Sequence, residues 1–233
     1  MSEPLYRIVF NKIISRIADG THPPGSMLPS EIDIGLDLNV SQGTARKALI
    51  ELERKGIIER RQGRGTFVTL RTPESSLFHF FRVRDADGNQ VVPDLDSETI
   101  TRRKSRAEEA NALFGTPEEV YQISRIRNFQ GKALSHETIV VSTKLFPGLQ
   151  ERGPLPNSLY VLFQHSYSCI IISAREKLRA SVLGTDLAAV MNCDPATPVI
   201  EAFRESLDLL DRVVELRTSL MITENVFYSI TLE

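Results

Sequence analysis

A stretch of forty residues near the N-terminus decides the fold of the first part of the chain. Residues 29–68 read PSEIDIGLDLNVSQGTARKALIELERKGIIERRQGRGTFV. Ser30 precedes a run of apolar residues and has Asp33 three positions later, so its hydroxyl can cap a short helix in a capping-box arrangement. Ser41 repeats this device at the start of a second helix, which Gly56 ends as a left-handed cap. Two helices separated by a few residues predict a helix-turn-helix.

The flanking residues extend this motif on both sides. Apolar residues between Leu5 and Ile17 recur at three- and four-residue steps, which predicts an amphipathic helix. The runs 57–61 and 65–68 favour strands, and the glycine-bearing residues 62–64 between them predict a hairpin. A helix, a helix-turn-helix and a basic hairpin in this order are typical of a winged helix-turn-helix.

The length of 233 residues favours two unequal domains over one. We expect a first domain over residues 1–70 and a second over residues 78–233. Polar residues and a proline at 71–77 offer little to a core and predict a linker there.

The second region alternates elements of both kinds. Residues 120–129 and 133–141 are β-prone runs joined through Gly131, which predicts an antiparallel hairpin. A strand is also expected around Phe78 and Phe80. Further helices are expected at 104–114, from 157 or 158 and at 184–191, and further strands at 168–180, 199–209, 213–223 and from 227. Helices inserted among hairpins predict an α+β domain with an antiparallel sheet.

Charge is distributed unevenly along the chain. The formal charge is -2, but residues 1–70 carry +2 and the remainder -4, and residues 54–64 hold five cations against one acid. This local concentration is the kind of footprint that binds phosphates. The two cysteines, Cys169 and Cys193, lack metal-ligand spacing, and no signal peptide or membrane span is apparent, so we expect a cytoplasmic protein with no metal or cofactor.

Several sequence words resemble the GntR family of bacterial regulators, and specifically its HutC-like branch. In the first domain they are Pro4-Leu5-Tyr6, residues 24–31, residues 40–49 and residues 60–68. The second domain resembles the UTRA effector-binding domain, whose fold is similar to that of chorismate lyase, through residues 125–127, Gly131, Glu137, 146–149, 158–160 and 214–215. The family often has arginines where this chain has Ile32, Gln42 and Asn225, so its operator and ligand should differ from those of other members.

A recognition helix places its first residues at base edges in the major groove, and a wing can enter the minor groove. Gln42 is a candidate to pair with adenine and Arg46 with guanine. The residues expected to bind DNA are Ser30, Glu31, Ser41, Gln42, Thr44, Arg46, Lys47, Arg60, Arg61, Arg64, Gly65 and Thr66. The alternatives are that Ser41 and Thr44 only cap the helix and that Lys47 is only a solvated charge.

Arg125 and Arg127 lie two apart on a predicted strand, so both should project from one face and could clamp a phosphate or carboxylate. The alternative is that they form salt bridges with Glu137 and Glu215. The resemblance implies an effector pocket lined by His79, Arg125, Arg127, Glu137, Ser158, Tyr160, Glu215 and Tyr228.

Together these features predict a DNA-binding transcription regulator, a repressor by expectation, whose affinity for double-stranded operator DNA responds to an anionic metabolite. The resemblance also implies a homodimer joined through the effector domains. Two alternatives stay open: a ligand-binding module whose DNA binding is weakened by Ile32 and Gln42, and a lyase-like enzyme. No nucleophile–base pair, metal motif or nucleotide loop supports the enzyme.

Overall fold

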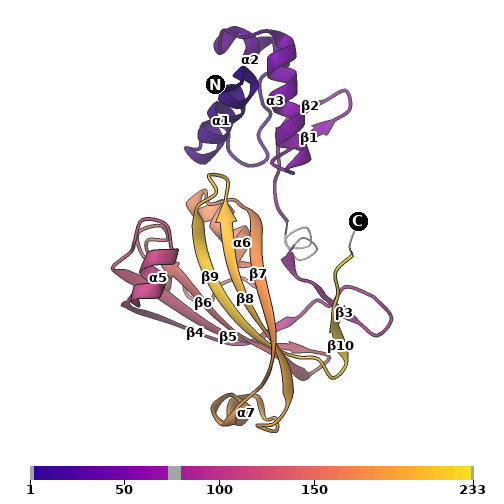
Figure 1. Ribbon diagram of the computed structural model, residues 1–233, viewed down its shortest axis with the longest axis vertical. Coiled ribbons are helices and arrows are strands. Elements are labelled where there is room, and N and C mark those ends of the chain that lie inside the picture. The colour runs from indigo at the N-terminus through magenta and orange to yellow at the C-terminus, as the bar shows by residue number, and fades with distance from the viewer. Residues whose placement is uncertain (1–2, 73–79, 232–233) are drawn as a thin grey trace. The chain divides into compact units, whose positions relative to one another are not determined.

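The computed structural model describes residues 3–72 and 80–231, which form two compact units (Figure 1). The first unit comprises Met1–Thr72, Tyr160–Ile172 and Asp208–Asp211, and the second comprises Pro73–Leu159, Ser173–Leu207 and Arg212–Glu233. Most of the expected linker at 71–77, and His79, lie outside the described residues. None of the helices in the described ranges has the length and apolar character needed to cross a membrane.

The N-terminal residues form three helices and a two-stranded hairpin. The elements are α1 (Leu5–Ala18), α2 (Glu31–Asp37), α3 (Gln42–Arg54), β1 (Ile58–Arg61) and β2 (Gly65–Val68). The buried faces of the helices share one core, which includes Ile13, Ile17, Leu49 and Leu52. This order of elements is the predicted winged helix-turn-helix.

Local capping chemistry fixes where the helices of this motif begin. The Ser30 hydroxyl accepts a hydrogen bond from the Asp33 amide, and the Asp33 carboxylate accepts one from the Ser30 amide, so the predicted capping box is present. Ser41 likewise accepts from the Thr44 amide at the start of α3. Gly56 has a φ of +66°, as expected for a left-handed cap.

The turn between α2 and α3 requires a glycine on α2. An added Cβ at Gly35 would lie 2.9 Å from the Val40 carbonyl oxygen. The same two residues are joined by a hydrogen bond from the Val40 amide to the Gly35 carbonyl. Gly35 therefore allows the close approach of the turn to the helix.

The second unit contains a six-stranded sheet of order β4-β5-β6-β9-β8-β7. Its strands are β4 (Asp94–Lys104), β5 (Glu119–Phe129), β6 (Lys132–Ser142), β7 (Ile171–Val182), β8 (Pro198–Asp208) and β9 (Val213–Ile222). The pairs β4–β5, β5–β6, β6–β9 and β8–β9 are all antiparallel, which confirms the predicted α+β class.

Several short elements complete the described chain. They are α5 (Ala107–Ala112), η1 (Gln150–Arg152), α6 (Leu159–Tyr167) and α7 (Thr185–Met191), with a separate ribbon of β3 (Val83–Asp85) and β10 (Val226–Tyr228). Leu113, just after α5, packs with Val120 at one end of β5, whereas α7 packs with Ile126 nearer the other end. Figure 1 shows α5 and α7 at opposite ends of the sheet.

The structure differs from the expectations in two places. β4 continues to Lys104, so the helix expected at 104–114 is confined to Ala107–Ala112. Phe80 is helical rather than extended, and Phe78 lies outside the described residues. Alternation of apolar and polar residues over so short a run did not distinguish the two conformations.

Candidate DNA-binding and effector-binding sites

The start of α3 presents an ordered polar surface. The Ser41 hydroxyl lies 2.9 Å from the Thr44 hydroxyl and accepts a hydrogen bond from the Thr44 amide at 3.2 Å, so Ser41 caps the helix and Thr44 holds that cap in place. Ser30 does the same for α2. Capping uses part of the hydrogen-bonding capacity of each hydroxyl, and the exposed Ser41 retains room for a phosphate oxygen.

The other predicted residues of α3 differ in how they are paired. Gln42 Nε2 lies 3.5 Å from Glu31 Oε2, and the Lys47 ammonium lies 4.3 Å from the centre of the Tyr6 ring. Arg46 is exposed and makes no hydrogen bond or ion pair with any described residue. Arg46 is therefore the α3 cation with its full charge available to a partner.

In the hairpin, acids already pair the two arginines of β1. Arg60 contacts Glu31 at 3.3 Å and Glu53 at 3.2 Å. Arg61 forms an ion pair with Glu59 and lies 4.5 Å from the Phe67 ring. Glu31, which is also predicted to bind DNA, joins α2 to the hairpin through this ion pair.

The tip of the hairpin remains open. Arg64 is exposed and its side chain forms no hydrogen bond or ion pair with the described residues, while its amide closes the turn on the Arg61 carbonyl at 2.9 Å. Gly65 follows with a φ of +116°, and an added Cβ there would lie 3.1 Å from Met27 Sδ. Thr66 pairs with Arg60 across the hairpin and is half-buried. Among the predicted DNA-binding cations of the described chain, Arg46 and Arg64 have neither an acidic partner nor a ring contact, and Lys47 has only the Tyr6 ring.

In the sheet, the two predicted arginines lie on one face and are buried. Arg125 is fully buried, and its guanidinium lies 2.5 Å from Glu98 on β4. Arg127 is buried beside Glu137 of β6 at 3.4 Å. The expected pairing of Arg127 with Glu137 is present, but the partner of Arg125 is Glu98, which sequence reasoning did not identify.

The cluster of charges continues onto the next strands. Arg217 on β9 lies 3.6 Å from Glu137 and 3.1 Å from Glu215. Glu215 is fully buried and accepts a hydrogen bond from the Ser206 hydroxyl at 3.0 Å. The predicted residue Glu215 therefore belongs to this network, but through Arg217 and not through Arg125 or Arg127.

The electrostatics of the cluster keep its central carboxylate ionised. Burial alone would raise the pKa of Glu137, but the guanidiniums of Arg217, Arg127 and Arg125 outweigh burial and hold this pKa below its ordinary value. Burial and the neighbouring Arg127 lower the pKa of Arg125 from its very high ordinary value. The site is a compact set of alternating charges.

A single loop covers the guanidiniums. The Asn157 carbonyl accepts from Arg125 at 3.2 Å and from Arg127 at 3.1 Å, and the Asn157 side-chain oxygen also accepts from Arg127. The Pro156 carbonyl accepts a further hydrogen bond from Arg125 at 3.0 Å. Because Asn157 itself is exposed, this loop forms the outer wall of the site.

The remaining predicted effector residues are placed differently. Ser158 is half-buried after Asn157, and Tyr160 is buried in α6 near Phe163, with ring centres 6.4 Å apart. Tyr228 on β10 donates its hydroxyl to Glu176, whose carboxylate also lies 2.9 Å from Arg204. Burial and this hydrogen bond raise the pKa of Tyr228 well above its usual range.

Sequence reasoning missed four members of the site. They are Glu98, Asn157, Arg217 and Ser135. Ser135 pairs with Arg127 across β5 and β6, is buried, and its hydroxyl finds no hydrogen-bond partner in the described chain. Arg217 is two positions from Glu215, and this alternation was the available signal.

Comparisons with known proteins agree with the arrangement of both units. Residues 5–68 match the family of bacterial regulatory proteins, gntR family, and residues 90–226 match the UTRA domain. An HTH-type transcriptional repressor of Salmonella typhimurium is 30% identical over 208 residues, covering 87% of this chain and 85% of the relative.

Two further proteins match most of the chain. The mannosyl-D-glycerate transport/metabolism system repressor of Escherichia coli is 26% identical, and the match covers 91% of this chain and 89% of the repressor. The crystal structure of PhnF from Mycobacterium smegmatis has a TM-score of 0.56 at 24% identity, covering 97% of this chain and 99% of that one. The similarity in structure supports the fold. The chain therefore belongs to the GntR family of bacterial regulatory proteins, with a UTRA domain, and is a DNA-binding transcription regulator.

Proposed function

We propose that this regulator is a repressor whose operator affinity is controlled by a small anionic metabolite bound at the arginine cluster of the sheet. Residues 1–70 form the DNA-binding domain and residues 78–233 form the effector-binding and dimerisation domain. The names of the relatives support repression, since both curated relatives described above are called repressors.

The proposed DNA contacts follow from which polar groups are unpaired. Arg46 reads base edges from α3, and Arg64 enters the minor groove from the wing, because both guanidiniums lack an acidic partner in the described chain. Ser41 and Thr44 meet backbone phosphates at the helix start, and Gln42 reads an adenine. Arg60 and Arg61, held by acids, contribute mainly to the position of the hairpin.

The proposal of an anionic ligand rests on the oxygens that accept hydrogen bonds from the two arginines in this structure. The carbonyls of Pro156 and Asn157 and the Asn157 amide are neutral acceptors. Phosphate or carboxylate oxygens in their place would form stronger, charge-assisted hydrogen bonds with Arg125 and Arg127. The orphan hydroxyl of Ser135, beside Arg127, would gain a partner from the same ligand.

Binding and loop displacement are coupled in this proposal. An anion that takes the hydrogen bonds of Asn157 releases the loop that holds it, and this loop leads directly into α6. The ligand can alter DNA binding only if it prefers one of the two loop states. One relative is the repressor of a system for mannosyl-D-glycerate, a sugar acid, which is consistent with an anionic effector.

We also propose a homodimer that presents two recognition helices to a palindromic operator, as helix-turn-helix proteins commonly do. β7 is an edge strand of the sheet, and its Leu178 and Val182 side chains are exposed. Light scattering on the purified chain should give twice the monomer mass, and a monomer at operator-binding concentrations would contradict the dimer.

The test combines a DNA titration with an effector screen. Fluorescence anisotropy with the chain's own upstream intergenic DNA, against scrambled competitor and at several salt concentrations, should show specific binding whose logarithm falls by about 0.9 per neutralised phosphate with log salt. Sugar phosphates and organic acids are then added to the complex and separately titrated by calorimetry.

Ser135→Ala separates a ligand role from a structural one. The variant removes an unpaired hydroxyl, so it should fold at least as well as the parent. We expect it to bind the anion identified in the screen roughly two- to tenfold more weakly. Two results would reject the arginine site. One is that only neutral compounds bind, and the other is that the Ser135→Ala and Arg127→Gln variants both keep the anion affinity of the parent.

A further inference from the structure

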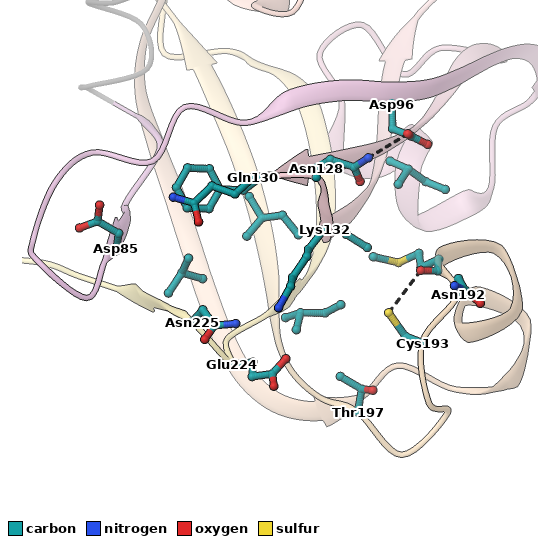
Figure 2. A pocket seen from close by; sticks show the side chains of 18 of the residues that line it. Asp85, Asp96, Asn128, Gln130, Lys132, Asn192, Cys193, Thr197, Glu224 and Asn225 are labelled. Atoms are coloured by element: carbon teal, nitrogen blue, oxygen red, sulfur yellow. Dashed lines mark hydrogen bonds between the residues drawn. The ribbon is translucent and has the colours of Figure 1, made fainter.

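The second unit contains a large cavity away from the arginine cluster. It has a volume of about 910 Å³ and lies between the β5–β6 turn, the end of α7, the β3 turn and the β9–β10 connection. Figure 2 shows Gln130 and Lys132, Asn192, and Glu224 and Asn225 around this hollow. A volume of this size is in the range of small-molecule sites, about 300–1,000 Å³.

This cavity is separate from the arginine site. Ile126, which lies between Arg125 and Arg127 in β5, lines the cavity. Successive side chains of a strand point to opposite faces, so Ile126 points away from the face that holds the two guanidiniums. Neither Arg125 nor Arg127 lines the cavity, so a ligand bound there contacts a different set of side chains.

The carboxylates of the cavity are largely committed to the protein itself. Asp85 accepts hydrogen bonds from the amides of Asp87 and Asn89, which lower its pKa, and Asp194 accepts from the Ala196 amide at 2.7 Å. Asp96 accepts from the Asn128 side chain at 2.8 Å. These acids shape turns and strands, so the cavity is less anionic than its composition implies.

The uncommitted polar groups are mostly neutral. Three side-chain amides of the cavity form no hydrogen bond with other described residues: those of Gln130, Asn192 and Asn225. The side chains of Lys132 and Glu224 form no ion pair with the described residues. A carboxamide both donates and accepts hydrogen bonds. This set complements hydroxyl groups, which also do both, better than it complements a charged ligand.

Apolar side chains form the rest of the lining. Ile126, Met191 and Ile222 come from the cluster around α7, while Leu134 and Val226 come from the cluster beneath the β3–β10 ribbon. Apolar walls with a few convergent polar groups are typical of small-molecule sites. They would bury the C–H faces of a ring whose edges carry hydroxyls.

From this chemistry we infer that the cavity is a second ligand site of the effector domain, which takes a neutral polyhydroxylated molecule of mono- or disaccharide size. The amides of Gln130, Asn192 and Asn225 bind its hydroxyls. Lys132 and Glu224 add one donor and one acceptor of opposite charge and so leave the preference for a neutral ligand intact.

Cys193 provides a reporter inside the cavity. Its thiol lines the cavity and is half-buried, whereas Cys169, the other cysteine of the chain, is buried. The full chain is alkylated with iodoacetamide in the presence of each member of a panel of neutral monosaccharides, disaccharides and sugar alcohols, with spermidine and citrate as charged comparators. Mass spectrometry of the Cys193 peptide gives the rate.

We expect at least one neutral member to slow Cys193 alkylation about tenfold at ten times its Kd. Asn225→Ala should weaken this protection roughly two- to tenfold. The distant, exposed helix variant Asn111→Ala should retain it. Arg127→Gln should also retain it, so failure of the arginine site and failure of this cavity are distinguishable.

Four outcomes would overturn the inference. The first is protection by spermidine alone with loss in Glu224→Gln, which would make the cavity a cation site. The second is protection by citrate alone. The third is the absence of protection by every neutral member. The fourth is equal protection in a Thr197→Phe variant that fills the cavity while its circular dichroism spectrum is unchanged.

Discussion

The arginines proposed to bind DNA and those proposed to bind the effector differ in exposure and in pairing. Arg46 and Arg64 are exposed and unpaired, whereas Arg125 and Arg127 are buried and satisfied by acids and carbonyls. The exposed pair is open to a partner, whereas in the proposed effector site a ligand would have to replace partners that the buried pair already has. Substitutions should accordingly change binding in the first region and stability in the second.

The largest effect is expected for Arg125→Ala. Removing this fully buried guanidinium leaves Glu98 without its cation, deprives the Pro156 carbonyl of its donor and leaves the Asn157 carbonyl with Arg127 alone. Breaking a buried ion pair in this way costs about 3–5 kcal/mol of unfolding free energy. Urea denaturation measures the loss, and Arg46→Ala is the control, which should change the unfolding free energy by less than about 0.5 kcal/mol. Equal effects of the two variants would remove the distinction between the regions.

Gly35→Ala tests whether the DNA-binding region is also tightly packed at one point. The new Cβ would meet the Val40 carbonyl at 2.9 Å, so the turn must move. We expect a loss of about 1–3 kcal/mol. Gly43→Ala, within α3, is the matched control, because its nearest neighbour would be Ser41 Oγ at 3.9 Å. The control should be stabilised by about 0.5–1 kcal/mol, and the same sign in both variants would contradict the packing argument.

Arg46→Ala sharpens the comparison on the side of binding. A bidentate contact to a base is worth about 1–3 kcal/mol, so operator affinity should fall more than about tenfold at fixed salt. Arg61→Ala removes a guanidinium already paired with Glu59 and should weaken binding much less. Anisotropy titrations of both variants against operator and scrambled DNA measure the difference. Unchanged affinity of Arg46→Ala would exclude its base-reading role.

The sequence predicted the two regions unequally, and the reason is physical. The caps at Ser30, Ser41 and Gly56 involve only residues a few positions away in the sequence. Local capping and periodicity were therefore enough to predict the helix-turn-helix. The shared face of Arg125 and Arg127 was likewise a local consequence of strand geometry. These predictions needed no knowledge of strand order.

The partners in the sheet were beyond such reasoning. Glu98 meets Arg125 because β4 pairs with β5 in one register, and Arg217 reaches Glu137 because β9 lies beside β6. Register and strand order depend on the whole hydrophobic pattern and on the turns. The cover provided by Asn157 depends on an irregular loop, for which no periodic signal exists. The sequence therefore predicted a charged site on the sheet but not its partners Glu98, Arg217 and Asn157.

The smallest expected effect is the pH dependence of the free energy of unfolding, to which His136 contributes in the sheet. Burial lowers the pKa of His136 despite the opposing influence of Glu137, and its ring accepts or donates a hydrogen bond with Ser124 at 2.7 Å. A lowered folded-state pKa means that the unfolded chain binds the proton more readily. Stability is therefore complete above the ordinary histidine pKa of about 6.5 and declines as the pH falls through it towards the folded-state pKa.

His136→Gln should flatten this decline in urea titrations between pH 7.5 and 5. Part of the decline should persist, because burial also lowers the pKa of His22 in the DNA-binding region, and His22→Gln should remove that part. If His136→Gln left the decline unchanged and His22→Gln abolished it, the acid sensitivity would belong to the DNA-binding region alone, because only a histidine whose proton affinity changes on folding can contribute a slope.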